Sequence, residues 1–451
     1  DGKFNKASYL WRARFATQHI RKLSKLRKRK WKPALVKPQM LPYRYKPHVI
    51  LDALHPGRKG DWIAPLKRKI TGDVQIKHFS FLDSPVETIE VLKEIVRCDA
   101  TCADYQIHFE VERCGDIAPF LVLGLMRRGM TPAASGGKIH RAIQKVLDAV
   151  QMLGFLRMNI RERAPSLDVW PLALREKKPG TSDAATQAFS AAHREKVTDD
   201  FVKAIDGWLH QVRAQSGTLG LSAEGKARLG RIFGELLDNA ERHSVPGNDR
   251  AGGWYVAGFM TKEKTDAGHK LVCHLSIVNT GQSIGDSLML AEDEDLRTRL
   301  HTYCNMHRKH FGSSESADEL LRTVCALQDR VSRKSQEEDR SSGGVGLMDM
   351  IDFVNALSSS AQGKEPPQIA ILSGSACVSL RAPYIRGMRR FDASDPRVLW
   401  FNLDNLPQRA PDGLHVFTLP CRFPGTIVSM RFNLDETEVQ SGQNLSWDIT
   451  G

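Results

Sequence analysis

The order of apolar and polar positions predicts both helices and strands in the first half of the chain. Three segments have the apolar spacing of helices that bury one face: Ser84–Val96, Ile117–Met126 and Ile139–Leu153. Two others alternate apolar and polar residues as half-buried strands do: Val74–Phe81 and Tyr105–Val111. Ser84 is a favourable N-cap, and Pro85 suits the first helical turn. These segments predict a small α/β module over residues 71–165.

The second half contains the strongest helical pattern in the chain, over Leu221–Ser244. Its apolar residues are spaced as one continuous stripe: Leu229, Ile232, Phe233, Leu236, Leu237 and Ala240. Gly253–Thr261 and Lys270–Val278 have the pattern of two strands joined by a polar turn, Lys262–His269. Further on, Gln368–Ser373 and Ala376–Leu380 predict a second hairpin, and Pro424–Phe432 a final strand.

These patterns divide the chain into five parts. We expect a basic segment (1–70), the α/β module (71–165), a connector with a Pro/Gly-rich stretch and a helix (166–214), a larger domain (215–435) and a tail (436–451). No stretch approaches the roughly 18 apolar residues that cross a bilayer. We therefore expect no membrane contact.

Charge is distributed unevenly between these parts. The formal net charge is +13, but residues 1–70 hold 20 Lys or Arg against 3 Asp or Glu, so the whole excess lies there. Aromatic residues are interleaved with the basic run, as at Trp31 and Tyr43. Such a segment attracts phosphate backbones by counterion release. Residues 12–46 are consistent with nucleic-acid binding, with docking on an acidic protein surface and with a solvated tail.

The cysteines favour a reducing compartment. The chain has eight of them, scattered and often within apolar runs, such as Leu271–Leu275. This distribution is typical of reduced thiols in a cytoplasmic protein rather than of a disulfide framework.

The helix over Leu221–Ser244 carries the first candidate chemistry. Glu235 and Asn239 are four residues apart, so they share a helix face. A carboxylate there can deprotonate an attacking water or hydroxyl group. A neighbouring amide oxygen can bind Mg²⁺, which prefers oxygen ligands. Taken alone, such a pair is more often a solvated helix face.

Three further motifs follow at strand and helix ends. Val278 is followed by Asn-Thr-Gly-Gln-Ser-Ile-Gly, where Asn279 could bind an adenine edge and Gly281 permits unusual dihedrals. Ser341–Met348 is a glycine-rich turn before an apolar run, a suitable anion site because helix N-termini present free N–H groups. Thr426 begins the last strand. Each motif alone fits an ordinary turn, loop or strand, and no P-loop motif is present.

In order and spacing, the four elements resemble the GHKL ATPase superfamily (gyrase, heat-shock chaperone, histidine kinase and MutL). Glu-Leu-Leu-Asp-Asn-Ala resembles the N box, Asn-Thr-Gly-Gln-Ser-Ile the first glycine box, Gly-Gly-Val-Gly-Leu the second, and Gly-Thr-Ile-Val-Ser-Met the terminal strand. The resemblance covers roughly 220 residues. It implies an α/β Bergerat fold, in which helices back one face of a mixed sheet and ATP lies on the other.

The resemblance also implies roles for individual residues. Glu235 would be the general base and Asn239 the Mg²⁺ ligand, while Asn279 would recognise adenine and Gly281 would form the turn beside it. The remaining ATP-binding positions would be Ser283, Gly343, Gly344, Gly346, Leu347 and Thr426. Asn279 stands where the family usually has Asp, and Ser283 where a second glycine is common. The charged span Asp286–Arg340 would form a helical lid that orders when ATP binds.

Two resemblances narrow the type of protein. Ala240, His243 and Ser244 after the N box resemble the anti-sigma-factor serine kinases, and residues 71–130 resemble STAS modules. The stretch Cys114–Pro119 lacks the Ser or Thr that STAS modules have as phosphoacceptor, so we expect a docking unit rather than a substrate. Our main hypothesis is a cytoplasmic regulatory ATPase that switches contacts with another subunit, a second copy or nucleic acid, by family analogy in a bacterial defence or stress module. The alternatives are a serine/threonine kinase acting in trans and a nucleic-acid-binding adaptor with a vestigial ATP site.

Overall fold

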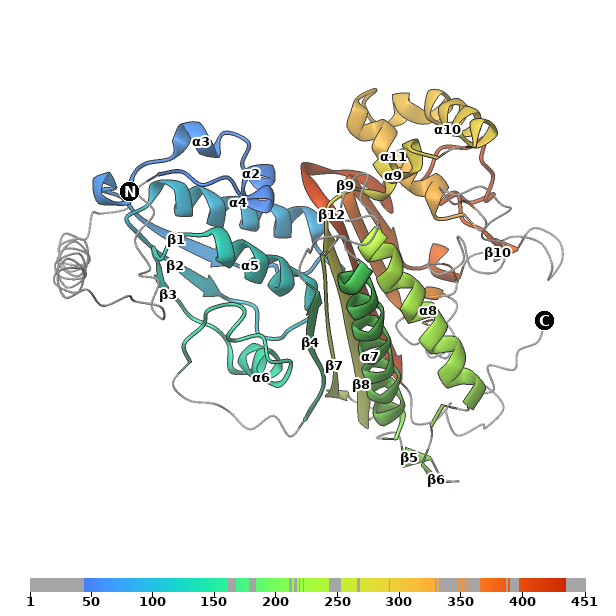
Figure 1. Cartoon of the computed structure of the whole chain (residues 1–451), viewed down its shortest axis with the longest axis horizontal. Helices are drawn as coiled ribbons and strands as arrows, with labels where there is room; N and C mark the ends of the chain where they lie inside the picture. The colour runs from blue at the N-terminus through green and yellow to red at the C-terminus, as the bar shows by residue number, and fades with distance from the viewer. Residues whose placement is uncertain are drawn as a thin grey trace.

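The computed structural model describes two main sheets with helices around them and two small two-stranded sheets (Figure 1). It covers residues 44–160, 168–177, 184–210, 220–242, 253–265, 268–328, 366–386 and 397–434, with gaps at 222 and 292, and short stretches between these ranges. Within this part, no helix is both long and apolar enough to cross a bilayer. Most of the basic stretch 12–46 lies outside the described residues.

The N-terminal module contains a parallel sheet. Its strands β1 (Thr71–Ile76), β2 (Asp104–Phe109) and β3 (Ala134–Gly136) lie in that order. The helices α4 (Pro85–Thr101), α5 (Ala118–Gly129) and α6 (Arg141–Ala149) alternate with them along the chain. Ser84 occupies the N-cap position of α4 and Pro85 its first turn, as predicted, but the Ser84 side chain makes no capping hydrogen bond. The predicted elements are thus present, with ends shifted by a few residues.

Part of the predicted basic segment belongs to this module. It contains α2 (Val49–Leu54), α3 (Arg58–Asp61) and the 3-10 turn η1 (Pro65–Lys67). Arg58 and Arg68 are each only 1% exposed; Arg58 pairs with Asp52 at 2.8 Å, and Arg68 donates to the Cys102 carbonyl at 3.1 Å. The predicted boundary at residue 70 therefore falls inside a packed structure, because two of these basic side chains, Arg58 and Arg68, are internal.

The larger sheet has the order β4-β7-β8-β12-β9, and all four described pairings are antiparallel. Its strands are β4 (Val169–Lys177), β7 (Gly253–Thr265), β8 (Gly268–Thr280), β9 (Gln368–Leu380) and β12 (Val416–Leu434). The chain is thus α/β with one parallel and one antiparallel sheet, and the mixed sheet expected for the second domain is not seen in the described pairings. The predicted connector supplies the edge strand β4.

Two strand predictions were wrong. The polar segment Lys262–His269 is not a long turn, since β7 and β8 stay paired as far as Thr265 and Gly268. The predicted hairpin within 368–380 is a single strand, β9. Gly374, with φ of +60°, interrupts its pairing with β12 instead of reversing the chain. In both cases, polar residues or glycine within a strand have the sequence pattern of a turn.

Helices cover one face of the larger sheet. They are α7 (Ala184–Leu209), α8 (Ala223–Arg242), α9 (Ile284–Met289), α10 (Glu294–His307) and α11 (Glu315–Ala326). The predicted stripe of α8 is buried against this face, apart from the half-buried Leu236. Smaller elements complete the description: β5 (Arg213–Ala214), β6 (Gly217–Thr218), η2 (Arg308–Phe311), η3 (Tyr384–Arg386), β10 (Met388–Arg389) and β11 (Arg397–Val398).

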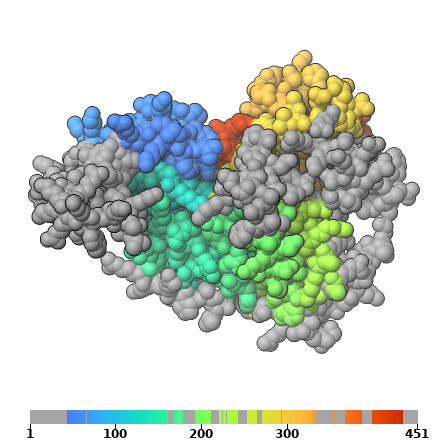
Figure 2. Space-filling model, viewed as in Figure 1, coloured from blue at the N-terminus to red at the C-terminus, as the bar shows by residue number. Residues whose placement is uncertain are grey.

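The opposite face of this sheet is covered by the N-terminal module. Tyr255, Phe259 and Phe423 share one buried cluster with residues of α2, α4 and α5, and Figure 2 shows the blue and teal module directly beside the red strands and green helices. The expectation that ATP lies on the sheet face away from the helices is therefore wrong, because side chains fill that face. The predicted boundary at 165 does not separate two cores.

A buried carboxylate joins the module to the sheet. Asp116, fully buried before α5, accepts hydrogen bonds from the Phe81 N–H (2.7 Å) and the Ala118 N–H (2.9 Å). It also accepts from the Ser429 hydroxyl on β12 at 2.6 Å, and Ser276 on β8 lies 2.9 Å from Ser429. Four segments of the chain thus meet at one side chain.

Replacing Asp116 with Ala should destabilise the fold by about 3 kcal/mol, because buried N–H donors lose their acceptor. Ser429→Ala should cost about 1 kcal/mol, the value of a typical single hydrogen bond. Urea unfolding of the full chain measures both. The exposed Asp295→Ala is the matched control, expected within about 0.5 kcal/mol of wild type. Equal midpoints for Asp116→Ala and this control would contradict the assignment.

Candidate functional site

A row of polar side chains crosses three strands near the carboxyl end of β8. Thr426 on β12 is paired with Asn279 on β8 and with Ser373 on β9. Neighbouring residues on the same face, such as Ile277 and Val428, pack in the core beneath α8. Since side chains alternate along a strand, the polar row also faces the helical layer. The same-face residues Ile277 and Val428 are apolar, so the row is a change in chemistry along β8 and β12.

Asn279 connects three separated parts of the chain. Its amide group donates to the carbonyl of Ala240 near the end of α8 at 3.3 Å, and its side-chain oxygen accepts from the Thr426 N–H at 2.7 Å. The N box helix, the first glycine box and the terminal strand therefore meet at one side chain. The side chain is 6% exposed. An amide has two N–H donors and two acceptor lone pairs, so these bonds leave one donor and one acceptor position.

Two glycines permit this close approach. Gly281 has φ of +147°, and its N–H donates to the Pro424 carbonyl at 2.9 Å. Gly425 has φ of +140°, and a Cβ there would lie 2.2 Å from the Asn279 carbonyl oxygen. Any larger residue at position 425 would separate β8 from β12 at this point. The unusual dihedral expected for Gly281 is present.

Thr426 and Ser373 form a hydroxyl pair beside Asn279. Their oxygen atoms are 2.7 Å apart, and Ser373 accepts the Ile284 N–H at 2.7 Å at the start of α9. The hydroxyl of Thr426 therefore already has a protein partner, whereas we expected it to contact nucleotide or bound water. Ser373 was missed by the sequence analysis; the only signal was a serine within an apolar strand.

Glu235 and Asn239 lie one turn apart on α8, before the Ala240 contact. Asn239 is exposed and Glu235 is half-buried. Mg²⁺ takes oxygen ligands and usually few from protein when phosphates are present. The exposed carboxamide of Asn239 fits such a limited role, and the carboxylate one turn away fits a base. Within the described residues, no group of three or more His, Cys, Asp or Glu forms a metal site.

Ser283 has a structural partner that we did not predict. It caps α9 and donates to Glu319 on α11 at 2.6 Å. Glu319 is 2% exposed and also accepts from the Ser375 N–H at 2.9 Å and from Arg422 at 3.0 Å. Burial acts to raise the pKa of Glu319, but the bonds from Ser283 and Ser375 and the charge of Arg422 together lower it below 4.5.

The Glu319 carboxylate holds the first part of the predicted lid in place. Residues 284–328 form helices, as expected, but Leu300, Tyr303 and Leu320 are buried in the sheet's core. Gly285 packs against α11 so closely that a Cβ would lie 2.8 Å from the Glu319 carbonyl oxygen. These helices are therefore packed into the core, and the ordering of the lid by ATP stays a prediction.

The second glycine box lies outside the described residues. Gly343, Gly344, Gly346 and Leu347 accordingly stay predictions for the phosphate-binding part of the site. A scan against protein-family models and searches of curated proteins and of solved structures found no match to this chain.

Glu319→Gln should lower stability at pH 7 by about 2 kcal/mol, because hydrogen bonds to a charged acceptor are lost. The pKa of Glu319 is depressed in the folded state, so its contribution is present above the unfolded value of 4.5 and is lost as pH falls through the folded value. Urea unfolding between pH 7 and pH 3 should therefore show a steeper acid loss in wild type than in Glu319→Gln.

Glu294→Gln provides the control, because this carboxylate is exposed on α10. It should keep the wild-type acid slope. Parallel slopes for Glu319→Gln and wild type would show that Glu319 does not carry this pH dependence.

Proposed function

We propose that this chain binds Mg-ATP at the carboxyl end of β8, between the end of α8 and the polar row, and hydrolyses it to change its contacts with a partner. One observation carries the proposal: the Asn279 amide joins Ala240 of the N box helix to Thr426 of the terminal strand. These are three of the four elements that resemble the GHKL ATPases. Their convergence supports the proposal because the family's nucleotide site requires it.

The free capacity of Asn279 suits adenine. One donor and one acceptor position remain on its amide, and the adenine edge offers an amino donor beside a ring-nitrogen acceptor. A carboxylate at this position would lack the donor that bonds the Ala240 carbonyl. The departure from the family's usual Asp is thus explained by the local structure. Access requires a small opening, since the side chain is 6% exposed.

The remaining roles are those that the family resemblance implies for side chains on α8. Asn239 would hold Mg²⁺, which supplies charge neutralisation on the phosphate oxygens when bound. Glu235 would take the proton from the attacking water. The glycine-rich segment containing Gly343, Gly344 and Gly346 would donate backbone N–H groups to the phosphates. Hydrolysis would then reset contacts with a protein partner, a second copy or a nucleic acid bound through residues 12–46.

Isothermal titration calorimetry of the full chain with ATP and Mg²⁺ should show binding. Glu235→Gln should bind ATP normally but hydrolyse it about 100-fold more slowly, as expected for loss of a general base. Asn239→Ala should weaken binding only when Mg²⁺ is present. The control Glu294→Gln should match wild type in both assays.

Asn279→Ala tests the adenine contact and should weaken ATP binding roughly tenfold, the value of one or two hydrogen bonds. Circular dichroism establishes first that the variant is folded, because Asn279 also has structural bonds. Thr426→Val is the second variant: it keeps the N–H bond to Asn279 and loses only the hydroxyl pair with Ser373. Unchanged affinity in a folded Asn279→Ala protein would remove Asn279 from the site, and no binding of any adenine nucleotide would overturn the proposal.

Label passing from γ-labelled ATP to a protein would instead favour the kinase alternative.

A further inference from the structure

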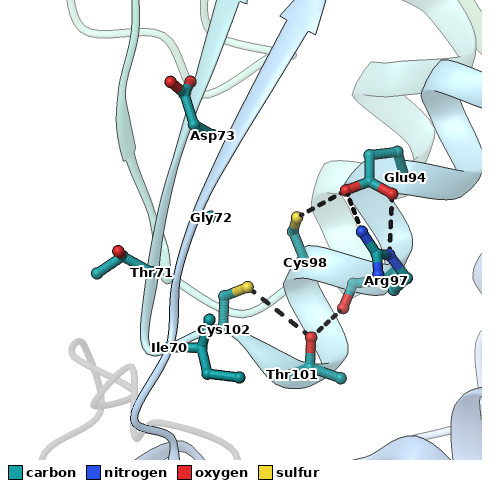
Figure 3. A pocket seen from close by; sticks show the side chains of 9 residues that line it. All are labelled: Ile70, Thr71, Gly72, Asp73, Glu94, Arg97, Cys98, Thr101 and Cys102. Atoms are coloured by element: carbon teal, nitrogen blue, oxygen red, sulfur yellow. Dashed lines mark hydrogen bonds and ion pairs between the residues drawn. The ribbon is translucent and has the colours of Figure 1, made fainter. Parts of the chain in front are cut away.

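A cavity lies in the N-terminal module, away from the proposed nucleotide site. It has a volume of about 550 Å³ and lies between β1 and the C-terminal end of α4 (Figure 3). Its lining residues are Ile70, Thr71, Gly72, Asp73, Glu94, Arg97, Cys98, Thr101 and Cys102. Two thiols and three ionisable side chains thus share one small space.

The two thiols lie on the same side of this cavity. Cys98 is in the last turn of α4, and Cys102 is its C-cap, in an extended conformation. A Cβ built on Gly72 would lie 2.9 Å from the Cys98 sulfur and 3.0 Å from the Cys102 sulfur. Both sulfur atoms therefore face the same point on β1, and a side chain at position 72 would displace them.

Their separation in the chain is suitable for a disulfide. Residues four apart along a helix have Cα atoms about 6 Å apart. Disulfides usually join Cα atoms roughly 4.4–6.8 Å apart. The C-cap conformation of Cys102 frees it from the helical direction of the preceding side chains. Bond formation therefore requires a local adjustment at the helix end and no movement of the sheet.

The surroundings make the two sulfur atoms chemically different. The Cys98 sulfur lies 3.6 Å from a carboxylate oxygen of Glu94, whereas the Cys102 sulfur lies 3.8 Å from the Thr101 hydroxyl. The pKa of Cys102 is lowered to about 7, mainly by a hydrogen bond from Cys98. Burial acts to raise this pKa, whereas Thr101, Arg68 and Arg97 lower it further. The same bond, burial and the charge of Glu94 raise the pKa of Cys98. Asp73 on β1 also lines the cavity and pairs with His108 at 3.0 Å.

We propose that Cys98 and Cys102 form a redox-active dithiol that reacts with small hydroperoxides. The Cys102 thiolate attacks the peroxide oxygen and the O–O bond breaks, so that a sulfenic acid forms; the leaving oxygen takes up the proton that Cys102 had released and departs as water or an alcohol. The Cys98 sulfur then attacks the sulfenic sulfur while its proton passes to the departing hydroxyl group; the S–O bond breaks and water leaves as the disulfide forms. Two thiols are oxidised by two electrons, and the peroxide is reduced by two.

Other thiols provide an internal comparison. Cys273 and Cys377 are fully buried in the larger sheet, and burial raises the pKa of both. Because the thiolate is the reactive form, these side chains should react slowly. Selectivity for the pair in the cavity is therefore a specific consequence of the proposal.

The test treats the full chain with limiting hydrogen peroxide, blocks the remaining thiols with iodoacetamide, and analyses tryptic peptides by mass spectrometry. Cleavage after Arg97 and Arg113 yields one peptide that contains Cys98 and Cys102 and no other cysteine. It should become lighter by two hydrogen atoms, without alkylation, and dithiothreitol should reverse this. Peptides with Cys273 and Cys377 should stay fully alkylated.

Variants distinguish the two roles. In Cys98→Ser the sulfenic acid at Cys102 should persist and be trapped by dimedone, whereas Cys102→Ser should leave Cys98 reduced. Cys273→Ser is the matched control and should form the disulfide as wild type does. Circular dichroism confirms folding in each case. The proposal is overturned if Cys98 and Cys102 stay alkylated in wild type, or if Cys273 oxidises as fast as they do.

Discussion

The larger sheet must bury both of its faces, and the rest of the structure depends on this requirement. Alternate residues of β7 show it: Trp254 and Val256 enter the core with α7 and α8, whereas Tyr255 and Ala257 enter the core with the N-terminal module. Apolar surface of this size stabilises a fold only when it is removed from water on both sides. The helices therefore cover one face of the sheet and the module covers the other, so that together they exclude solvent from both faces (Figure 1).

This constraint also determines where chemistry can occur. Both sheet faces are filled, so a ligand has access only where strands end and polar groups replace apolar ones. The carboxyl end of β8 meets that condition, with Asn279, Thr426 and Ser373 in adjacent strands. The same end is held by α8 through Ala240 and by α9 through Ile284. A site supported on so many elements is well positioned before any ligand arrives.

Local pattern was sufficient for some features and not for others. The stripe of α8 and the cap of α4 were predictable because they depend on residues within a few turns. The mistakes arose where distant contacts decide. Polar residues at 262–265 and 268–269 continue two paired strands, and the Glu319 carboxylate occupies the space that a side chain at Gly374 would need. Asp116, Glu319 and Ser373 could not be predicted, because each is a single polar residue whose partners are far away in sequence. The convergence of Ala240, Asn279 and Thr426 was implied only by the family resemblance.

The bond between Asp116 and Ser429 has a consequence for synthesis of the protein. Its partners are 313 positions apart in the chain. Translation proceeds from the N-terminus, so the early module leaves the ribosome long before β12 exists to complete it. Until then the apolar surface of α2, α4 and α5 that faces the sheet is exposed to the cell, and such surfaces attract aggregation or chaperones. Folding is thus expected to be slow and to finish only after β12 has been made.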